Sequence, residues 1–247
     1  MNLSTFESNG WKWFFWSLFP LYALCYAPYG VNETDGGFIT GLAWQLLSGK
    51  VLYQDIVYIR PPIPVFLRAL ELKLLPEYYA VLGERWIFYL KVWLYSYMAA
   101  RLLMPNPKKW ILATIGFIVS VHCYPAMAWH TVDGIFFAVL SAYLWFCSPL
   151  RYQGLGFWLA GSAAAISMLC KQSFYPLLPF FGVAMYLDHQ STGRQKLLFA
   201  GGVASALALW WVYLAQAGLS AMYMSLTAGS TTTGQAVQHG LFDYWMI

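Results

Sequence analysis

Charged residues are scarce in this sequence. They make up 10% of its 247 residues, whereas hydrophobic residues make up 60% and aromatic residues 19%. A soluble domain normally carries about a quarter charged residues. Apolar runs close to the length of a membrane span recur along the whole chain, so the composition predicts an all-α polytopic membrane protein.

Two further absences exclude other classes. The chain has no lysine- or arginine-rich block and a formal net charge of only +4, so we expect no nucleic-acid partner. Its four cysteines form no CxxC or Cys/His pattern, so we expect buried apolar side chains rather than disulfides or metal ligands. The first apolar run, 11–30, lacks an Ala-x-Ala cleavage site, which favours a retained signal anchor over a cleaved secretory signal.

The sequence predicts seven membrane spans. They cover residues 11–30, 86–104, 110–128, 132–149, 154–170, 174–188 and 197–218. The segment 61–76 has apolar residues at helical spacing but also carries Arg68, Glu71 and Lys73. A charge at the bilayer centre costs at least about 2.5–3.5 kcal/mol, so we predict an amphipathic helix lying at the membrane interface instead.

The basic residues support that choice. With an interfacial helix at 61–76 and a cytoplasmic N-terminus, every short loop follows the positive-inside rule except at Lys171. The predicted location is therefore an integral membrane position, most simply a bacterial inner membrane. Four segments then share the external face: the long loop 31–85, the turn 122–134, the turn 170–173 and the tail 219–247.

The long external loop opens with "NETDGGFITGLAWQLLSGK", in which residues 35–47 have the pattern of a short amphipathic helix. Phe38, Leu42, Ala43, Leu46 and Leu47 form the expected apolar face, with Gly49 as the C-cap. Asp35 is either the N-cap of this helix or a general base at the membrane rim.

A basic residue followed by two prolines, Arg60-Pro61-Pro62, suits an anion site. The prolines extend the chain at Arg60 and suit the first turn of a helix, whose free amides would bind an anion beside the guanidinium. The alternative is an arginine that extends towards lipid headgroups. Both interpretations place Arg60 near lipid phosphate.

Later polar residues on the same face are also candidates. Asp133 is either a helix cap or a functional acid at the start of a span. Lys171 either extends to headgroups or has a fixed anionic partner. His130 is either a hydrogen-bonded structural histidine or, with Asp35, a ligand of a divalent ion, for which two residues are too few to predict a metal.

Four motifs in the long loop, "DGG" (35–37), "LLSG" (46–49), "YQD" (53–55) and "RPP" (60–62), are followed by "VDG" (132–134) and "CKQ" (170–172). This ordered set resembles the GT-C superfamily of membrane glycosyltransferases. The branch it resembles contains the protein-O-mannosyltransferases and the lipid A aminoarabinose transferases, glycosyltransferase family 39 and relatives. Gly36 departs from the family's usual Glu, and Arg60 from its usual Lys.

The resemblance implies inverting transfer of a sugar from a polyprenyl- or dolichyl-phosphate donor to an acceptor hydroxyl on the external face. Asp35 would be the catalytic base, and Arg60 would contact the lipid phosphate. Lys171, Gln172, Asp133, His130 and Asp55 are the further binding candidates. The acceptor would be a lipid, a glycan or a protein, and no cofactor is implied.

The resemblance also divides the chain. Residues 1–218 would be the transmembrane catalytic module, and 219–247 the start of an external loop of a chain cut short relative to the family. A non-enzymatic membrane protein, such as a transporter fragment or a lipid-binding scaffold, is the main alternative.

Overall fold

The computed structural model describes residues 3–29, 35–106, 108–148 and 154–224. These residues form nine α-helices and two short 3-10 helices, with no strand among them. The helices are α1 (Leu3–Cys25), α2 (Asp35–Leu47), α3 (Ile63–Leu74), α4 (Ala80–Leu103), α5 (Lys109–Cys123), α6 (His130–Phe146), α7 (Leu155–Met168), α8 (Leu177–Leu187) and α9 (Gly193–Ala217). The predicted all-α class is confirmed, and each of the seven apolar runs contains a helix.

The helices differ in whether their length suits a bilayer. Among the described residues, only α9 is both long and apolar enough to cross a membrane by itself, while α5, α6 and α7 are apolar but shorter. The predicted span 174–188 contains only the 11 residues of α8. At 1.5 Å per residue α8 is about 16 Å long, well below the roughly 30 Å of a hydrocarbon core.

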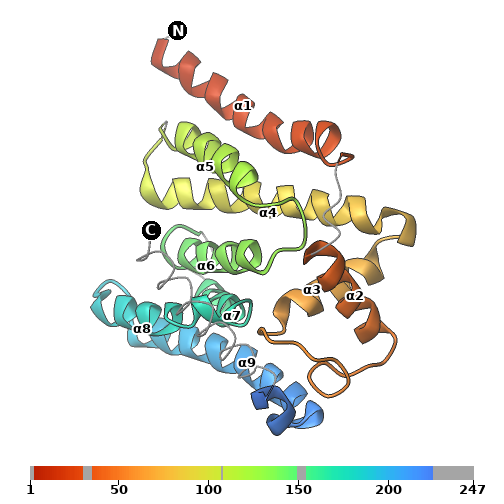
Figure 1. Cartoon of the computed structure of the whole chain (residues 1–247). Helices are drawn as coiled ribbons and strands as arrows, with labels where there is room; N and C mark the ends of the chain where they lie inside the picture. The colour runs from red at the N-terminus through yellow and green to blue at the C-terminus, as the bar shows by residue number, and fades with distance from the viewer. Residues whose placement is uncertain (1–2, 30–34, 107, 149–153, 225–247) are drawn as a thin grey trace, which may run out of the picture.

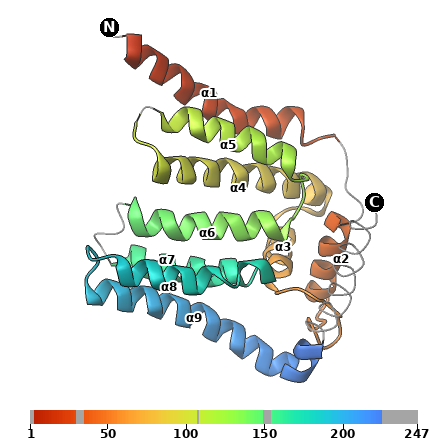
Figure 2. The same cartoon turned by 60° about the vertical axis from the view of Figure 1, so that its left-hand side comes forward.

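The long helices lie side by side with their axes roughly aligned, while α2 and α3 lie at one end of the stack (Figures 1 and 2). Helix α4 packs on α1, α5 and α6, and α7 packs on α6, α8 and α9. Helices α2 and α3 pack on each other, and α3 also packs on α4. We call the end of the stack that carries these two helices the α2/α3 end.

The chain direction brings distant segments to the α2/α3 end. Helices α1, α5, α7 and α9 finish there, and α4, α6 and α8 begin there (Figure 2). The loop 48–62, the segment 124–129 and the segment 169–176 therefore meet at this end. The sequence predicted that the long loop, the two turns and the tail would come together on one face, and the described parts of these four segments do meet at the α2/α3 end. Residues 225–247 of the tail lie outside the described residues.

Aromatic packing holds the first helices together. Phe15 of α1 stacks on Trp93 of α4 with ring centroids 5.5 Å apart, and Phe15 also contacts Trp110 of α5. The Trp93 indole donates to the Phe15 carbonyl at 3.1 Å. Burial of such large rings, with the indole hydrogen-bonded, is the main source of stability at this junction.

One prediction about apolar side chains needs correction. Cys170 is buried, but Cys25 and Cys123 are exposed, although all four cysteines are free. In α2, Leu42 and Ala43 are buried, whereas Phe38 is 55% and Leu47 41% exposed. The side of α2 that carries Ile39, Leu42 and Ala43 faces the protein, and its main helix neighbour there is α3.

Candidate functional site

The segment around Arg60 is fixed from three directions. Gln172 Nε2 donates to the Ile59 carbonyl at 2.7 Å, and the Tyr53 hydroxyl donates to the Arg60 carbonyl at 2.7 Å. The Ile63 amide donates to the Leu169 carbonyl at 3.2 Å. The loop 48–62 is thus tied to the end of α7, and the backbone of Arg60 is held in place.

The prediction that free amides at the start of α3 would help to bind an anion is wrong. The Ile63 amide is bonded to Leu169, Pro64 has no N–H, and the Val65 amide donates to the Pro62 carbonyl. The prolines do begin α3 as predicted, with Pro62 as its N-cap. Any anion at this place must therefore be bound by side chains.

Arg60 lies against a buried histidine. Its Nη1 atom is 3.0 Å from Nδ1 of His130, whose side chain is on the first residue of α6 and is 1% exposed. Lys171 reaches the same helix turn, because its Nζ donates to the Thr131 hydroxyl at 3.1 Å. We call Arg60, His130 and Lys171 the basic cluster.

The charges in the basic cluster act on one another. Burial, followed by the charges of Arg60 and Lys171, lowers the pKa of His130 to about 3. Partial burial and the charge of Arg60 lower the pKa of Lys171. No described carboxylate lies within ion-pair distance of Arg60 or Lys171. The cluster is therefore two cations beside a neutral imidazole, an arrangement that favours an anion.

The anionic partner expected for Lys171 is not present among the described side chains, since its partner is the Thr131 hydroxyl. Asp133 also differs from the expectation that it caps α6. The N-cap is Trp129, without a side-chain cap, and Asp133 Oδ1 instead accepts from Lys91 Nζ at 2.6 Å. Thr131, the partner of Lys171, lies two residues before Asp133 on α6, yet Asp133 and Lys171 belong to different sets of contacts.

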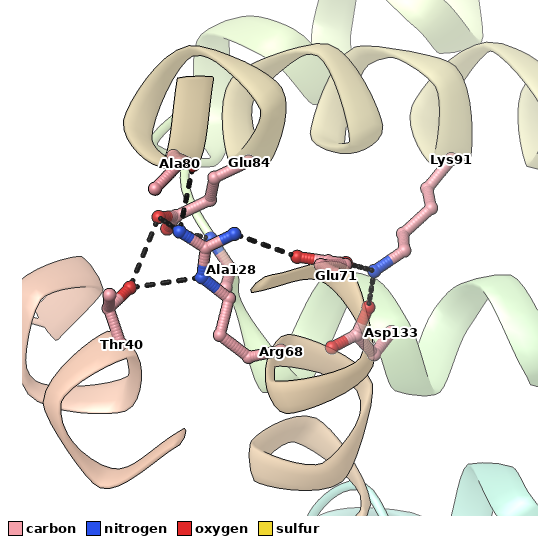
Figure 3. Close-up of polar contacts among 8 residues, drawn as sticks. All are labelled: Thr40, Arg68, Glu71, Ala80, Glu84, Lys91, Ala128 and Asp133. Atoms are coloured by element: carbon pink, nitrogen blue, oxygen red, sulfur yellow. Dashed lines mark hydrogen bonds and ion pairs between the residues drawn. The ribbon is translucent and has the colours of Figure 1, made fainter. Parts of the chain in front are cut away.

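Asp133 is the end of a buried line of alternating charges, which we call the ion chain (Figure 3). Lys91 also lies 3.3 Å from Glu71, Glu71 lies 3.1 Å from Arg68, and Arg68 lies 2.9 Å from Glu84. The ion chain joins α3, α4 and α6. The Arg68 side chain is completely buried and also donates to Thr40 of α2 and to the Ala80 carbonyl.

The ion chain explains how α3 holds its charges. The sequence predicted that interfacial placement would leave them solvated, but Arg68 and Glu71 point into the protein (Figure 3), whereas Leu70 is 53% and Leu74 74% exposed. Only Lys73 is exposed as expected. Pairing inside the protein thus replaces solvation for Arg68 and Glu71, while Leu70 and Leu74 lie on the outer face.

Glu84 links the ion chain to the start of α2. Its carboxylate accepts from the Thr40 hydroxyl at 3.3 Å and from the Ala128 amide. A Cβ atom at Gly36 would lie 3.2 Å from Glu84 Oε1. A carboxylate from α4 therefore lies beside the position where the family pattern has Glu. Burial raises the pKa of Glu84, against the opposing effect of Arg68.

Two acidic candidates have different outcomes. Asp35 is the first residue of α2, and its side chain lies outside the described part of the chain. Asp55 is exposed, and its Oδ2 accepts from the Val51 amide at 2.8 Å, which closes a local turn. Asp55 thus has a structural contact within the loop and no contact with the basic cluster. Gly49, with φ of 90°, follows α2 as the predicted C-cap.

An apolar groove of about 480 Å³ lies next to Arg60. Pro61 and Pro62 form one side, Met168 and Leu169 of the α7 end adjoin them, and Trp210 and Leu214 of α9 form the other side. The Tyr53 ring also lines it. The groove begins at Pro61, directly after Arg60, and its apolar lining suits the apolar part of an amphiphile.

The residues that the sequence did not single out are mostly polar side chains buried by distant contacts. Tyr58 is 1% exposed, and its hydroxyl has no hydrogen-bond partner among the described residues. Burial raises its pKa, with Arg60 opposing and Asp133 adding to the effect, so Tyr58 lies between the basic cluster and the ion chain. Its only sequence signal was its position two residues before Arg60.

The metal interpretation of His130 receives no support from its surroundings. No group of three or more metal-ligating side chains occurs within the described residues. Both cations of the basic cluster also repel a divalent ion at His130. Comparison of the chain with protein-family models, curated protein sequences and solved structures finds no match.

Proposed function

We propose that the chain is an integral membrane glycosyltransferase of the GT-C type. It transfers a sugar, with inversion, from a polyprenyl- or dolichyl-phosphate donor to an acceptor hydroxyl on the external face. The observation that carries this proposal is the pairing of the basic cluster, at the α2/α3 end of the helix stack, with an apolar groove that begins at Pro61, the residue after Arg60. The resemblance of the ordered motifs to the GT-C superfamily supports this type of reaction, and the basic cluster would bind the phosphate of the lipid-linked donor.

The outer surface supports a membrane position. Exposed apolar side chains follow α8 and α9, where Phe180 is 68%, Leu209 76% and Trp211 59% exposed. On α1, Trp13 is 69% and Leu24 71% exposed. Soluble monomers rarely show continuous apolar patches of this extent. We therefore assign these faces to lipid, with the predicted spans inserted and the basic cluster at interface depth.

The chemistry gives a role to the two cations of the basic cluster. Departure of the lipid phosphate from the anomeric carbon places growing negative charge on its oxygens. Arg60 and Lys171 stabilise that charge, and the N-terminal end of α6 adds a favourable dipole. Asp35, at the start of α2, takes the proton from the acceptor hydroxyl. The isoprenoid chain would lie in the apolar groove.

The first test separates phosphate binding from transfer. In protein reconstituted in nanodiscs, Arg60→Ala should weaken binding of farnesyl phosphate about 10- to 100-fold, since a hydrogen bond to a charged group contributes about 1.5–3 kcal/mol. Arg60→Lys should keep most of the affinity because it keeps the charge. Lys73→Ala, a change of an exposed lysine on α3, is the matched control and should leave binding unchanged.

The second test concerns the base. Asp35→Asn should abolish sugar transfer from a radiolabelled polyprenyl-phosphate donor while leaving farnesyl phosphate binding intact. Transfer at the unaltered rate would refute the assignment of Asp35. Binding of the lipid phosphate without transfer to any lipid, glycan or protein acceptor would instead favour the alternative, a non-enzymatic lipid-binding protein, because the same cluster and groove serve both.

A further inference from the structure

The environment of His130 is unusual for a histidine because cations surround it. Arg60 of the loop contacts its ring, and Lys171 contacts the neighbouring Thr131. The Trp129 ring lies against it with centroids 4.6 Å apart. The carboxylate on its own helix, Asp133, is already paired with Lys91 of α4.

These contacts keep the imidazole neutral in the free protein. Burial is the largest cause of its lowered pKa, and Arg60 and Lys171 add to it. The neutral ring is then an acceptor for the Arg60 guanidinium. A ligand that offsets the two positive charges removes that repulsion and raises the pKa of His130, because nearby negative charge favours imidazolium.

The proposed reaction changes the charge of the ligand at this place. The donor is a phosphodiester with one negative charge, and the lipid product is a phosphate monoester with two. The diester leaves a net charge of +1 on the site with Arg60 and Lys171, whereas the monoester reduces it to zero. Only the second state leaves no net repulsion against a third cation.

We propose that His130 is the charge-sensing residue of the phosphate site: it stays neutral beside the lipid phosphodiester and takes up a proton from solvent beside the phosphate monoester. This inference rests on the proposed function. No bond to carbon changes in this step; the ring gains one proton and becomes a donor to the phosphate. Product release then requires loss of that proton, so release should become faster as the pH rises.

Proton uptake on binding gives a direct test. Calorimetry in two buffers of different ionisation enthalpy would use farnesyl phosphate and its methyl diester, with the protein in nanodiscs. At about pH 7.5 a free phosphate monoester, with a second pKa of about 6, is already mostly a dianion and contributes little. Wild-type protein should take up more protons with the monoester than with the diester, by at most one per site, as linkage requires for one titrating group.

Two variants separate His130 from its neighbour. His130→Gln should take up no proton with the monoester, and the same titrations give its affinity for the monoester and for the diester. Lys171→Arg keeps a permanent charge at that position, so its proton uptake should match wild type. Uptake that persists in His130→Gln, or that disappears in Lys171→Arg, would overturn the assignment to His130.

The outcomes also distinguish this inference from the proposed function. Normal binding of both ligands with equal proton uptake would overturn the role of His130 and leave the phosphate site standing. Failure of wild-type protein to bind either ligand would overturn the phosphate site, and the inference with it. The comparison of monoester with diester in wild-type protein needs no variant, so a folding defect in His130→Gln cannot obscure the result.

Discussion

At the scale of single residues, the ion chain and the basic cluster differ in how their charges are paired. The ion chain satisfies every charge with a protein partner, from Glu84 to Asp133 (Figure 3). The basic cluster leaves Arg60 and Lys171 without a described carboxylate. Pairing offsets the cost of burying the charges of the ion chain, whereas Arg60 and Lys171 are only partly buried and contact neutral side chains.

Lys91 is the residue on which the ion chain most depends, because it pairs with both Glu71 and Asp133. Lys91→Met would leave Asp133, with a side chain 3% exposed, without its cation. We expect a loss of about 3–5 kcal/mol in the free energy of unfolding, as for other broken buried pairs. The thermal midpoint in detergent measures this loss.

A second substitution supplies the control for Lys91. Adding Asp133→Asn to Lys91→Met removes the unpaired charge and should restore part of the lost stability, as charge removal predicts. The exposed Lys73→Met should have almost no effect. A double variant less stable than Lys91→Met alone would contradict the view that Asp133 is held mainly by Lys91.

The residue scale also shows where sequence reasoning stops. The motif order led to Arg60, Lys171 and Gln172, and the spacing to Asp133 led to His130. The structure brings these four residues together. Their polarity and position at the ends of apolar runs were the available signal. Apart from Glu71, three positions after Arg68 on α3, the partners of Asp133 and Arg68 were not predictable, because those contacts join residues 12 or more positions apart on different helices, as for Lys91 and Asp133.

At the scale of helices, apolar periodicity located the elements well but oriented some of them poorly. Helix α3 forms at the predicted prolines, yet its charged residues Arg68 and Glu71 face inward. Leu70 and Leu74 are exposed, whereas Leu72 is buried. Periodicity shows that a helix has two faces, but it does not show which face meets protein when the other can meet lipid.

The crossing of α7 and α9 depends on glycine. A Cβ atom at Gly202 would overlap the Trp158 carbonyl oxygen, and one at Gly161 would overlap the Phe199 carbonyl oxygen. The two backbones therefore touch directly, as in other helix pairs that use small residues. The Ser162 hydroxyl adds a bond to the Gly202 carbonyl at 3.2 Å.

Gly202→Ala should consequently destabilise the protein by about 1–3 kcal/mol, the usual cost of inserting a methyl group into a packed junction. Gly201→Ala is a close control. Its Cβ would meet only the Trp158 ring at 4.0 Å, and alanine favours the helix by about 0.5–1 kcal/mol. The difference between the two thermal midpoints measures the contact itself. Equal thermal midpoints for Gly202→Ala and Gly201→Ala would mean that the added methyl group at position 202 does not disturb the contact between α7 and α9.

At the scale of the whole molecule, the charge distribution differs between the two ends of the stack. At the end opposite α2 and α3, Arg101 lies in the last turn of α4, Lys108 lies between α4 and α5, and Arg194 and Lys196 lie at the start of α9. At the α2/α3 end, Arg68 is neutralised within the ion chain and Arg60 and Lys171 belong to the basic cluster, while Lys50 and Lys73 are exposed in the long segment between α1 and α4. The proposed orientation follows the short connections and places the opposite end in the cytoplasm.

Cysteine labelling in intact cells tests this orientation. In a background with all four native cysteines replaced by serine, Lys50→Cys would report on the α2/α3 end and Gln190→Cys on the loop between α8 and α9. Both positions are exposed. A membrane-impermeant thiol reagent should label Lys50→Cys directly and Gln190→Cys only after the cells are permeabilised.

The labelling result bears on the function because a lipid-phosphate site must lie on one defined leaflet. Labelling of Gln190→Cys alone would invert the topology and place the basic cluster in the cytoplasm, where the proposed external acceptor is absent. Labelling of both positions in intact cells would mean that the helices do not separate the two ends across a bilayer. The expected pattern requires α8 to connect the two ends of the helix stack, although α8 is only about 16 Å long. The hydrocarbon thickness that α8 does not span would then be filled by its neighbours α7 and α9.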